Sequence, residues 1–166
     1  DRNILPAVIR ALRGNRWCIF DRIRLHILAH TQIVNRDLLA EALLDEKLLV
    51  EYQVRVEYTA LLKARYASLR KRDKERLVTM LTSVGLDDPN GADESDGERL
   101  KRQDGVIRDR LQLIQPHLQG KWRDYFDELA GRTSTSPVAW DRANLRAEIS
   151  IGDRSPFAPR PAHATL

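Results

Sequence analysis

The sequence predicts an all-α fold, a short α-solenoid or irregular helical bundle followed by an extended C-terminal tail. Apolar residues recur at intervals of three, four and seven in at least five segments between residues 3 and 130, as in helices that bury one face. Short breaks rich in Gly, Asn or Pro separate these segments. Hydrophobic residues make up 42% of the chain and charged residues 31%, so 166 residues suffice for one ordered domain with its own core.

The first predicted helix covers residues 3–13 and stops at Gly14. The second runs from Arg16 to His30 and carries apolar residues around most of its circumference. We therefore expect it to be the central core helix. Its predicted buried side chains are Trp17, Phe20, Ile23, Leu25, Ile27 and Leu28.

Three more helices are expected before residue 86. Asn35 is a plausible N-cap for a helix that ends near Leu44, and a longer helix should span residues 51–69. The pattern of the next helix is the cleanest, because its apolar residues fall at i, i+3, i+4 and i+7 before a glycine that can cap its end. Those residues are Leu77, Met80, Leu81, Val84 and the capping Gly85.

Residues 86–98 contain six acidic and no basic residues, and Pro and Gly interrupt them, which predicts a solvated linker loop. The linker divides the chain into an N-terminal helical bundle, residues 1–85, and a C-terminal helical pair, residues 99–131. Beyond this pair the helical pattern is lost, so residues 132–166 are expected to be extended and partly disordered.

The composition restricts the classes of partner and compartment. The formal charge of +4 is small and both signs are mixed along the chain, so it does not by itself establish nucleic-acid binding. Cys18 is the only cysteine, which excludes an intrachain disulfide and a cysteine-based zinc site. No signal peptide and no apolar run of about 20 residues is visible. We expect a cytoplasmic protein with no membrane contact.

No set of residues predicts catalysis. His26 and His30 have a spacing that can hold zinc on a helix, but Ile27 occupies the place where a metalloprotease needs its general base. We expect the two histidines to lie at the boundary of the core. Phosphate-binding and nucleophile-elbow motifs are also missing. The sequence predicts no enzyme, no catalytic residue, no metal site and no cofactor.

A basic stretch is the first candidate binding site. Residues 62–77 contain seven Lys or Arg residues and one tyrosine. Such a combination can contact a nucleic-acid backbone through the cations and stack a base on the aromatic ring. The alternative is a helix end, a turn and a helix start with solvated charges. The candidate residues are Lys63, Arg65, Tyr66, Arg70, Lys71, Arg72, Lys74 and Arg76.

An aromatic stripe is the second candidate. Trp122, Tyr125 and Phe126 fall on one side of a helix predicted for residues 119–130, and Arg110 and Arg123 can provide a polar rim for a protein partner. Core packing against the preceding helix is the favoured interpretation, because large apolar residues at helical spacing usually pack inside.

Three segments together resemble a known kind of protein region: RWCIFDRIRLHILAH (16–30), residues 54–81, and IRDRLQLIQPHLQGKWRDYFDELAG (107–131). They are similar to a HEAT-like helical region of very large bacterial NTPase-like proteins, of the type found in signal-transducing NTPases and in anti-phage defence. The resemblance covers residues 5–157 and includes GDRSPF at 152–157. The segment RTSTSPVAWDRANLRAEIS departs from the acidic, aromatic connector that such regions carry.

The resemblance implies a scaffold or sensing segment that binds other protein parts, while the nucleotide-binding core of such proteins is not contained in these residues. No catalytic residue can be transferred from it. We therefore expect a non-catalytic protein-interaction segment. The alternative is a helical domain that binds nucleic acid through its basic stretch.

Overall fold

The structure, a computed structural model, describes residues 4–13, 15, 17–32, 35–86 and 95–133. Within these residues the chain forms eight α-helices, three short 3-10 helices and no β-strand, which confirms the all-α class. The predicted tail lies outside the described residues from residue 134 onward. The helices are α1 (Ile4–Arg13), α2 (Cys18–His30), α3 (Arg36–Leu43), α4 (Glu46–Val50), α5 (Arg55–Arg65), α6 (Lys71–Ser83), α7 (Asp96–Gln112) and α8 (Lys121–Arg132), with 3-10 helices η1 (Tyr52–Val54), η2 (Tyr66–Ser68) and η3 (Gln115–His117).

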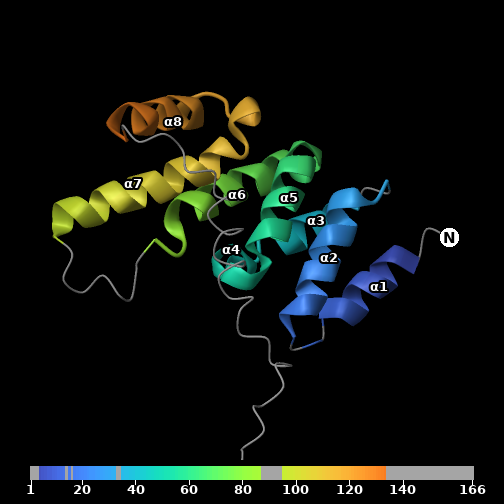
Figure 1. The fold of residues 1–166 in the computed structure, drawn as a ribbon. Helices are drawn as coiled ribbons and strands as arrows, with labels where there is room; N and C mark the ends of the chain where they lie inside the picture. The colour runs from blue at the N-terminus through green and yellow to red at the C-terminus, as the bar shows by residue number, and fades with distance from the viewer. Residues whose placement is uncertain (1–3, 14, 16, 33–34, 87–94, 134–166) are drawn as a thin grey trace, which may run out of the picture.

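The helices follow one another across the molecule, with α1 and α2 at one end and α7 and α8 at the other (Figure 1). Helix α2 packs on α1 and, more extensively, on α5, while α6 packs on α7 and α7 on α8. Helices α7 and α8 lie side by side in the picture, as expected for a helical pair joined by a short connection. None of the described helices has both the length and the apolar composition that a membrane span requires.

The helix predicted for residues 51–69 is interrupted in the structure. A separate five-residue helix, α4, precedes it, and 3-10 turns lie on both sides of α5. Helix α4 begins after Asp45, whose Oδ1 accepts a hydrogen bond of 3.1 Å from the Lys47 amide, and its Leu48 and Leu49 are buried. Helix α4 is not predictable from the sequence pattern, because five residues are too few to show a helical period.

The predicted acidic linker ends earlier than residue 98. Ser95 and Glu98 form a capping box, in which each side chain accepts from the other residue's backbone amide, so α7 begins at Asp96. Asp96 and Glu98 therefore lie in the first turn of a helix, where carboxylates interact favourably with the helix dipole. Residues 87–94 of the predicted linker lie outside the described residues.

One buried cluster includes helices on both sides of the predicted linker. Among its members, Tyr58, Leu61, Leu62, Leu77 and Leu81 precede the linker, and Leu111, Ile114, Phe126 and Leu129 follow it. Burying a leucine contributes about 1.5–3 kcal/mol, so this shared cluster is a large part of what holds α7 and α8 on the rest of the chain. The division into two units stays a prediction, but the described helices of both units share one core.

Arg110, considered above as part of a polar rim, is buried and instead connects α7 to the end of α6. Its guanidinium is 3% exposed and donates from Nη1 to the carbonyl oxygens of Leu81 and Val84, at 3.2 and 2.6 Å. Those carbonyls belong to the end of α6, where a helix carries partial negative charge and lacks internal donors. The pKa of Arg110 is lowered to about 10, mainly by burial; Tyr58 opposes this lowering, and the neighbouring Arg55 adds to it.

Gly85 ends α6 at this joint with a φ of +60°, a backbone conformation in which a side chain is strained. A Cβ at this position would lie 2.3 Å from Cγ1 of Val50. The predicted role of Gly85 as the stop of this helix therefore agrees with the structure. The turn leads directly to Leu86, whose carbonyl oxygen accepts from Arg102 of α7 at 2.9 Å.

Candidate interaction surfaces

The aromatic stripe of α8 packs mainly inward. Phe126 is 4% exposed and belongs to the buried cluster, and Trp122 and Tyr125 are half-buried against it. The Trp122 and Tyr125 rings meet edge to face, with centroids 6.3 Å apart. This arrangement agrees with the favoured core-packing interpretation and removes Phe126 from the residues that a partner could contact.

The half-buried aromatic residues of α8 border a shallow depression of about 370 Å³. It is lined by Thr82, Lys121, Trp122 and Tyr125. The Lys121 ammonium lies 5.0 Å from the Trp122 ring centroid, within the range of a cation–π interaction. Burial raises the pKa of the Tyr125 hydroxyl, and nearby Asp104 acts in the same direction. Arg123 does not line the depression; its Nε donates to Asp127 at 3.1 Å on the exposed side of α8.

Arg65, a member of the basic stretch, has a structural role. The Arg65 guanidinium donates to the backbone carbonyls of Leu28, Ala29 and Thr31, the first two at 3.2 and 3.1 Å. It therefore satisfies the end of α2 in the same way that Arg110 satisfies the end of α6. The sequence offered no sign of this role, because the accepting carbonyls are more than 30 residues away.

Tyr66, the aromatic member of the stretch, is 4% exposed. Its ring stacks on His117 with centroids 5.6 Å apart, and the Lys74 ammonium lies 5.6 Å from the Tyr66 ring centroid. Burial raises the pKa of its hydroxyl. This burial disfavours a role for Tyr66 in stacking on a nucleic-acid base, which was one of the two interpretations of the stretch.

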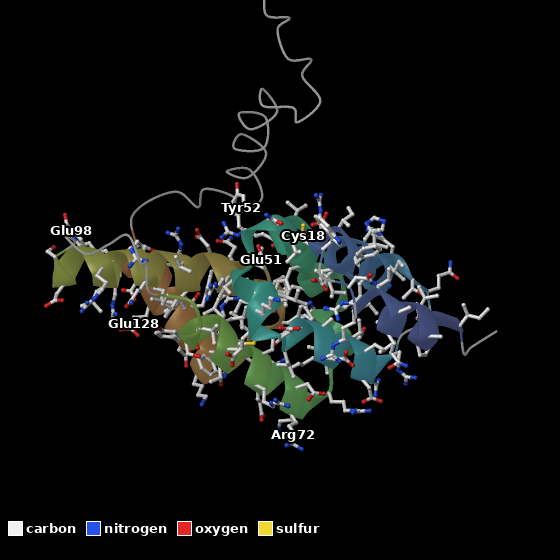
Figure 2. The ribbon with its side chains drawn as sticks, turned by 90° about the horizontal axis from the view of Figure 1, so that it is seen from below. Cys18, Glu51, Tyr52, Arg72, Glu98 and Glu128 are labelled. Atoms are coloured by element: carbon white, nitrogen blue, oxygen red, sulfur yellow. The ribbon has the colours of Figure 1, made fainter. Side chains whose placement is uncertain are left out.

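Apart from Lys74, which is half-buried, the remaining cations of the stretch are exposed. Helix α5 ends at Arg65, η2 turns the chain, and α6 begins at Lys71, which is the helix–turn–helix arrangement considered as the alternative. Arg72 lies on the edge of the molecule opposite Cys18 and Tyr52 (Figure 2). The exposed members are Lys63, Arg70, Lys71, Arg72 and Arg76, and of these Arg70 donates to Asp37 at 2.8 Å.

The buried face of α2 differs from the predicted one. The structure buries Leu25 and Leu28, as predicted, together with Arg24 and Ala29, but Trp17 is 74% exposed and Ile23 41% exposed. The predicted Phe20 and Ile27 are only half-buried. Helix α2 is therefore buried on one side and not around most of its circumference, because its main packing partners, α1 and α5, leave Trp17 and Ile23 exposed.

The uncovered side of α2 carries several of the large hydrophobic residues that are exposed in the described part of the chain. Eight of the nine large hydrophobic residues that are exposed in the described part of the chain lie between residues 4 and 56, and Leu100 is the ninth. The members of this set on α2, η1 and α5, here called the N-terminal apolar surface, are Trp17, Ile19, Ile23, Tyr52 and Val56.

An ion pair connects the helices that carry this surface. Nε of Arg22 on α2 donates to Glu57 on α5 at 2.8 Å, and α2 also contacts η1. Cys18 and Tyr52 lie on the same edge of the molecule in Figure 2, which places the start of α2 beside η1. This surface was not predicted from the sequence, because large apolar residues within amphipathic helices are expected to pack in the core.

His26 and His30 are exposed on the outer side of α2, which corrects the expectation that they lie at the boundary of the core. Their ring centroids are 4.4 Å apart. No group of three or more His, Cys, Asp or Glu side chains with the arrangement of a metal site occurs among the residues that the structure describes.

The chain was also compared with known proteins. It matches no protein-family model, no curated protein and no solved structure.

Proposed function

We propose that this chain is a non-catalytic helical scaffold and protein-interaction segment of a larger bacterial NTPase-like protein, of the type associated with signal transduction and anti-phage defence. The observation that carries the proposal is the N-terminal apolar surface of Trp17, Ile19, Ile23, Tyr52 and Val56. Large apolar side chains that are exposed in one part of a folded domain are typical of contacts with another protein or domain. The link to NTPase-like proteins depends on the sequence resemblance alone.

The energetics favour a protein partner for this surface. Each of its side chains is at least 40% exposed, so a contacting helix can still remove a large apolar area from water. Full burial of such a side chain contributes about 1.5–3 kcal/mol, and the aromatic residues Trp17 and Tyr52 are types that often dominate binding energy. The half-buried Trp122 and Tyr125 of α8 offer a smaller second contact.

Crosslinking in the full-length parent protein tests the proposal. A photoreactive amino acid placed at Ile23 should form crosslinks to another segment of the parent or to a bound protein, whereas the same amino acid at the exposed Lys101 of α7 should not. Equal crosslinking from both positions, or none from Ile23, would reject the surface as an interface. A reading frame that encodes no nucleotide-binding core would reject the NTPase part of the proposal.

We propose nucleic-acid binding as the second candidate function, because Lys63, Arg70, Lys71, Arg72 and Arg76 are all exposed near the α5–α6 corner. With Tyr66 buried, such binding has to use phosphate contacts and be independent of sequence. Each phosphate contact should contribute about −0.9 to the slope of log K against log salt concentration on duplex DNA.

The test compares two triple variants of equal charge. Lys71→Ala/Arg72→Ala/Arg76→Ala should lower the magnitude of the salt slope, whereas Arg10→Ala/Lys101→Ala/Lys121→Ala, which removes three exposed cations elsewhere, should leave it almost unchanged. An equal loss in both variants would show that only the net charge matters, and would reject a site at this corner.

The proposal places the segment in the cytoplasm. Its only cysteine, Cys18, is half-buried at the start of α2 and can form no intrachain disulfide, which suits a reducing compartment. Fractionation of cells that produce the full-length parent, with detection by an antibody to this segment, would place it directly. Recovery in a membrane or secreted fraction would reject this part of the proposal.

A further inference from the structure

The outer side of α2 holds two imidazoles within reach of one ion. His26 and His30 stand one helical turn apart, both are exposed, and their ring centroids are 4.4 Å apart with an interplanar angle of 45°. Metal–imidazole bonds are about 2.0–2.1 Å long, so two nitrogens on one ion lie roughly 3 Å apart. Ring centroids at the observed separation allow this spacing after small rotations of exposed side chains.

The donor atoms at this position select a class of ion. Ile19 and Ile23 occupy the preceding positions of the same side of α2, and the one acidic residue of the helix, Asp21, pairs with Arg24 at 3.3 Å. The outer side of α2 therefore offers nitrogen donors and no carboxylate. Imidazole suits Cu²⁺, Ni²⁺ and Zn²⁺, whereas Mg²⁺ and Ca²⁺ prefer oxygen ligands.

We propose that His26 and His30 form a two-histidine surface site for a divalent transition-metal ion, with Cu²⁺ bound most tightly, then Ni²⁺ or Zn²⁺. Solvent or an external ligand occupies the remaining coordination positions, because the described residues supply no third ligand. This site differs from the catalytic zinc site that the sequence disfavours, since it needs no general base at Ile27. It also differs from the proposed protein contact, because its ligand is a metal ion.

Binding at this site depends on the folded helix. Helix α2 holds the two imidazoles side by side, whereas an unfolded chain separates them most of the time. An ion that binds only the folded state raises the stability of the protein by mass action. The site should therefore be visible both as bound metal and as an increase in Tm.

The test uses the full chain without an affinity tag, and titrates it with Cu²⁺, Ni²⁺, Zn²⁺ and Mg²⁺ by calorimetry. The wild type should bind one equivalent of Cu²⁺, Ni²⁺ or Zn²⁺, and no Mg²⁺. His26→Ala or His30→Ala should weaken binding by at least about tenfold, because one ligand no longer holds the ion near the second. Electron paramagnetic resonance of the Cu²⁺ complex should show two nitrogen ligands.

Three control variants separate this pair from other histidines. His117→Ala and His163→Ala should bind like the wild type. The variant His30→Ala/Gln32→His keeps the number of histidines but moves one beyond the end of α2, to an exposed position, and should lose the tight binding and the metal-dependent increase in Tm. Equal binding by this variant or by His26→Ala, or no binding by the wild type, would overturn the proposal.

Discussion

Helices α2 and α8 carry similar apolar stripes, but the stripe of α8 packs inward, whereas much of the stripe of α2 is exposed. On α8, Phe126 is buried and its neighbouring aromatic residues are half-buried against α7 and the end of α6. On α2, Trp17 and Ile23 face solvent, although the helix also has a buried side. Helical spacing identifies a stripe, but the number and position of the packing partners decide whether the stripe is covered. A helix that is apolar on several sides needs more partners than α2 has.

The largest expected difference between the two stripes is in folding stability. Phe126→Ala removes a buried aromatic ring and leaves a cavity between α7 and α8, so it should lower the free energy of unfolding by about 3–5 kcal/mol. Trp17→Ala changes a 74% exposed side chain and should stay within about 0.5 kcal/mol. Urea unfolding followed by circular dichroism measures both. A similar loss in both variants would contradict the contrast between the stripes.

The next prediction concerns the C-terminal end of α2, where the Arg65 guanidinium donates hydrogen bonds to backbone carbonyls. Arg65→Ala leaves the carbonyls of Leu28, Ala29 and Thr31 without this donor and should lower the free energy of unfolding by about 2 kcal/mol. Arg65→Lys should recover part of the loss, because it keeps the charge but not the guanidinium fork. Arg72→Ala, an exposed change in the same basic stretch, should alter stability by less than about 0.5 kcal/mol.

The sequence was sufficient for the fold class and for most helices, because these depend on local periods and stop signals. Asn35 caps α3 as predicted, with its Oδ1 accepting from the amides of Asp37 and Leu38 at 3.1 Å. The start of α7 was missed although Ser95 and Glu98 form a recognisable capping box, because the acidic composition of the segment outweighed the motif. Helix α4 gave too short a signal to detect.

The candidate sites were less predictable, because they depend on contacts between distant residues. Arg65 and Arg72 are chemically identical in the sequence, but one binds the end of a helix more than 30 residues away and the other faces solvent. Tyr66 is buried and stacks on His117, which lies 51 residues further along the chain. Composition identified the basic stretch, and only the tertiary packing separated its structural members from its surface members.

A smaller effect on stability is expected at the turn that follows α6. Gly85→Ala places a side chain at a φ of +60° and 2.3 Å from Val50 Cγ1. It should lower the free energy of unfolding by about 1–2 kcal/mol. The double variant Val50→Ala/Gly85→Ala should keep the conformational part of the cost. Gly105→Ala, inside α7 with open space around it, should instead stabilise the protein by about 0.5–1 kcal/mol. Thermal unfolding distinguishes the two signs.

The double variant Ile19→Ser/Ile23→Ser is expected to have a smaller effect on stability than Phe126→Ala, Arg65→Ala or Gly85→Ala, and it tests the comparison most directly. Ile and Ser have similar helix propensities, so the substitution changes the apolar surface of α2 more than the helix itself. The free energy of unfolding should shift by less than about 1 kcal/mol, while the binding of a hydrophobic dye decreases. Leu25→Ser, on the buried side of the same helix, should lower the free energy of unfolding several times more than the double variant does. If the double variant is instead as unstable as Phe126→Ala, then the outer side of α2 is covered in solution, and α2 and α8 use their stripes in the same way.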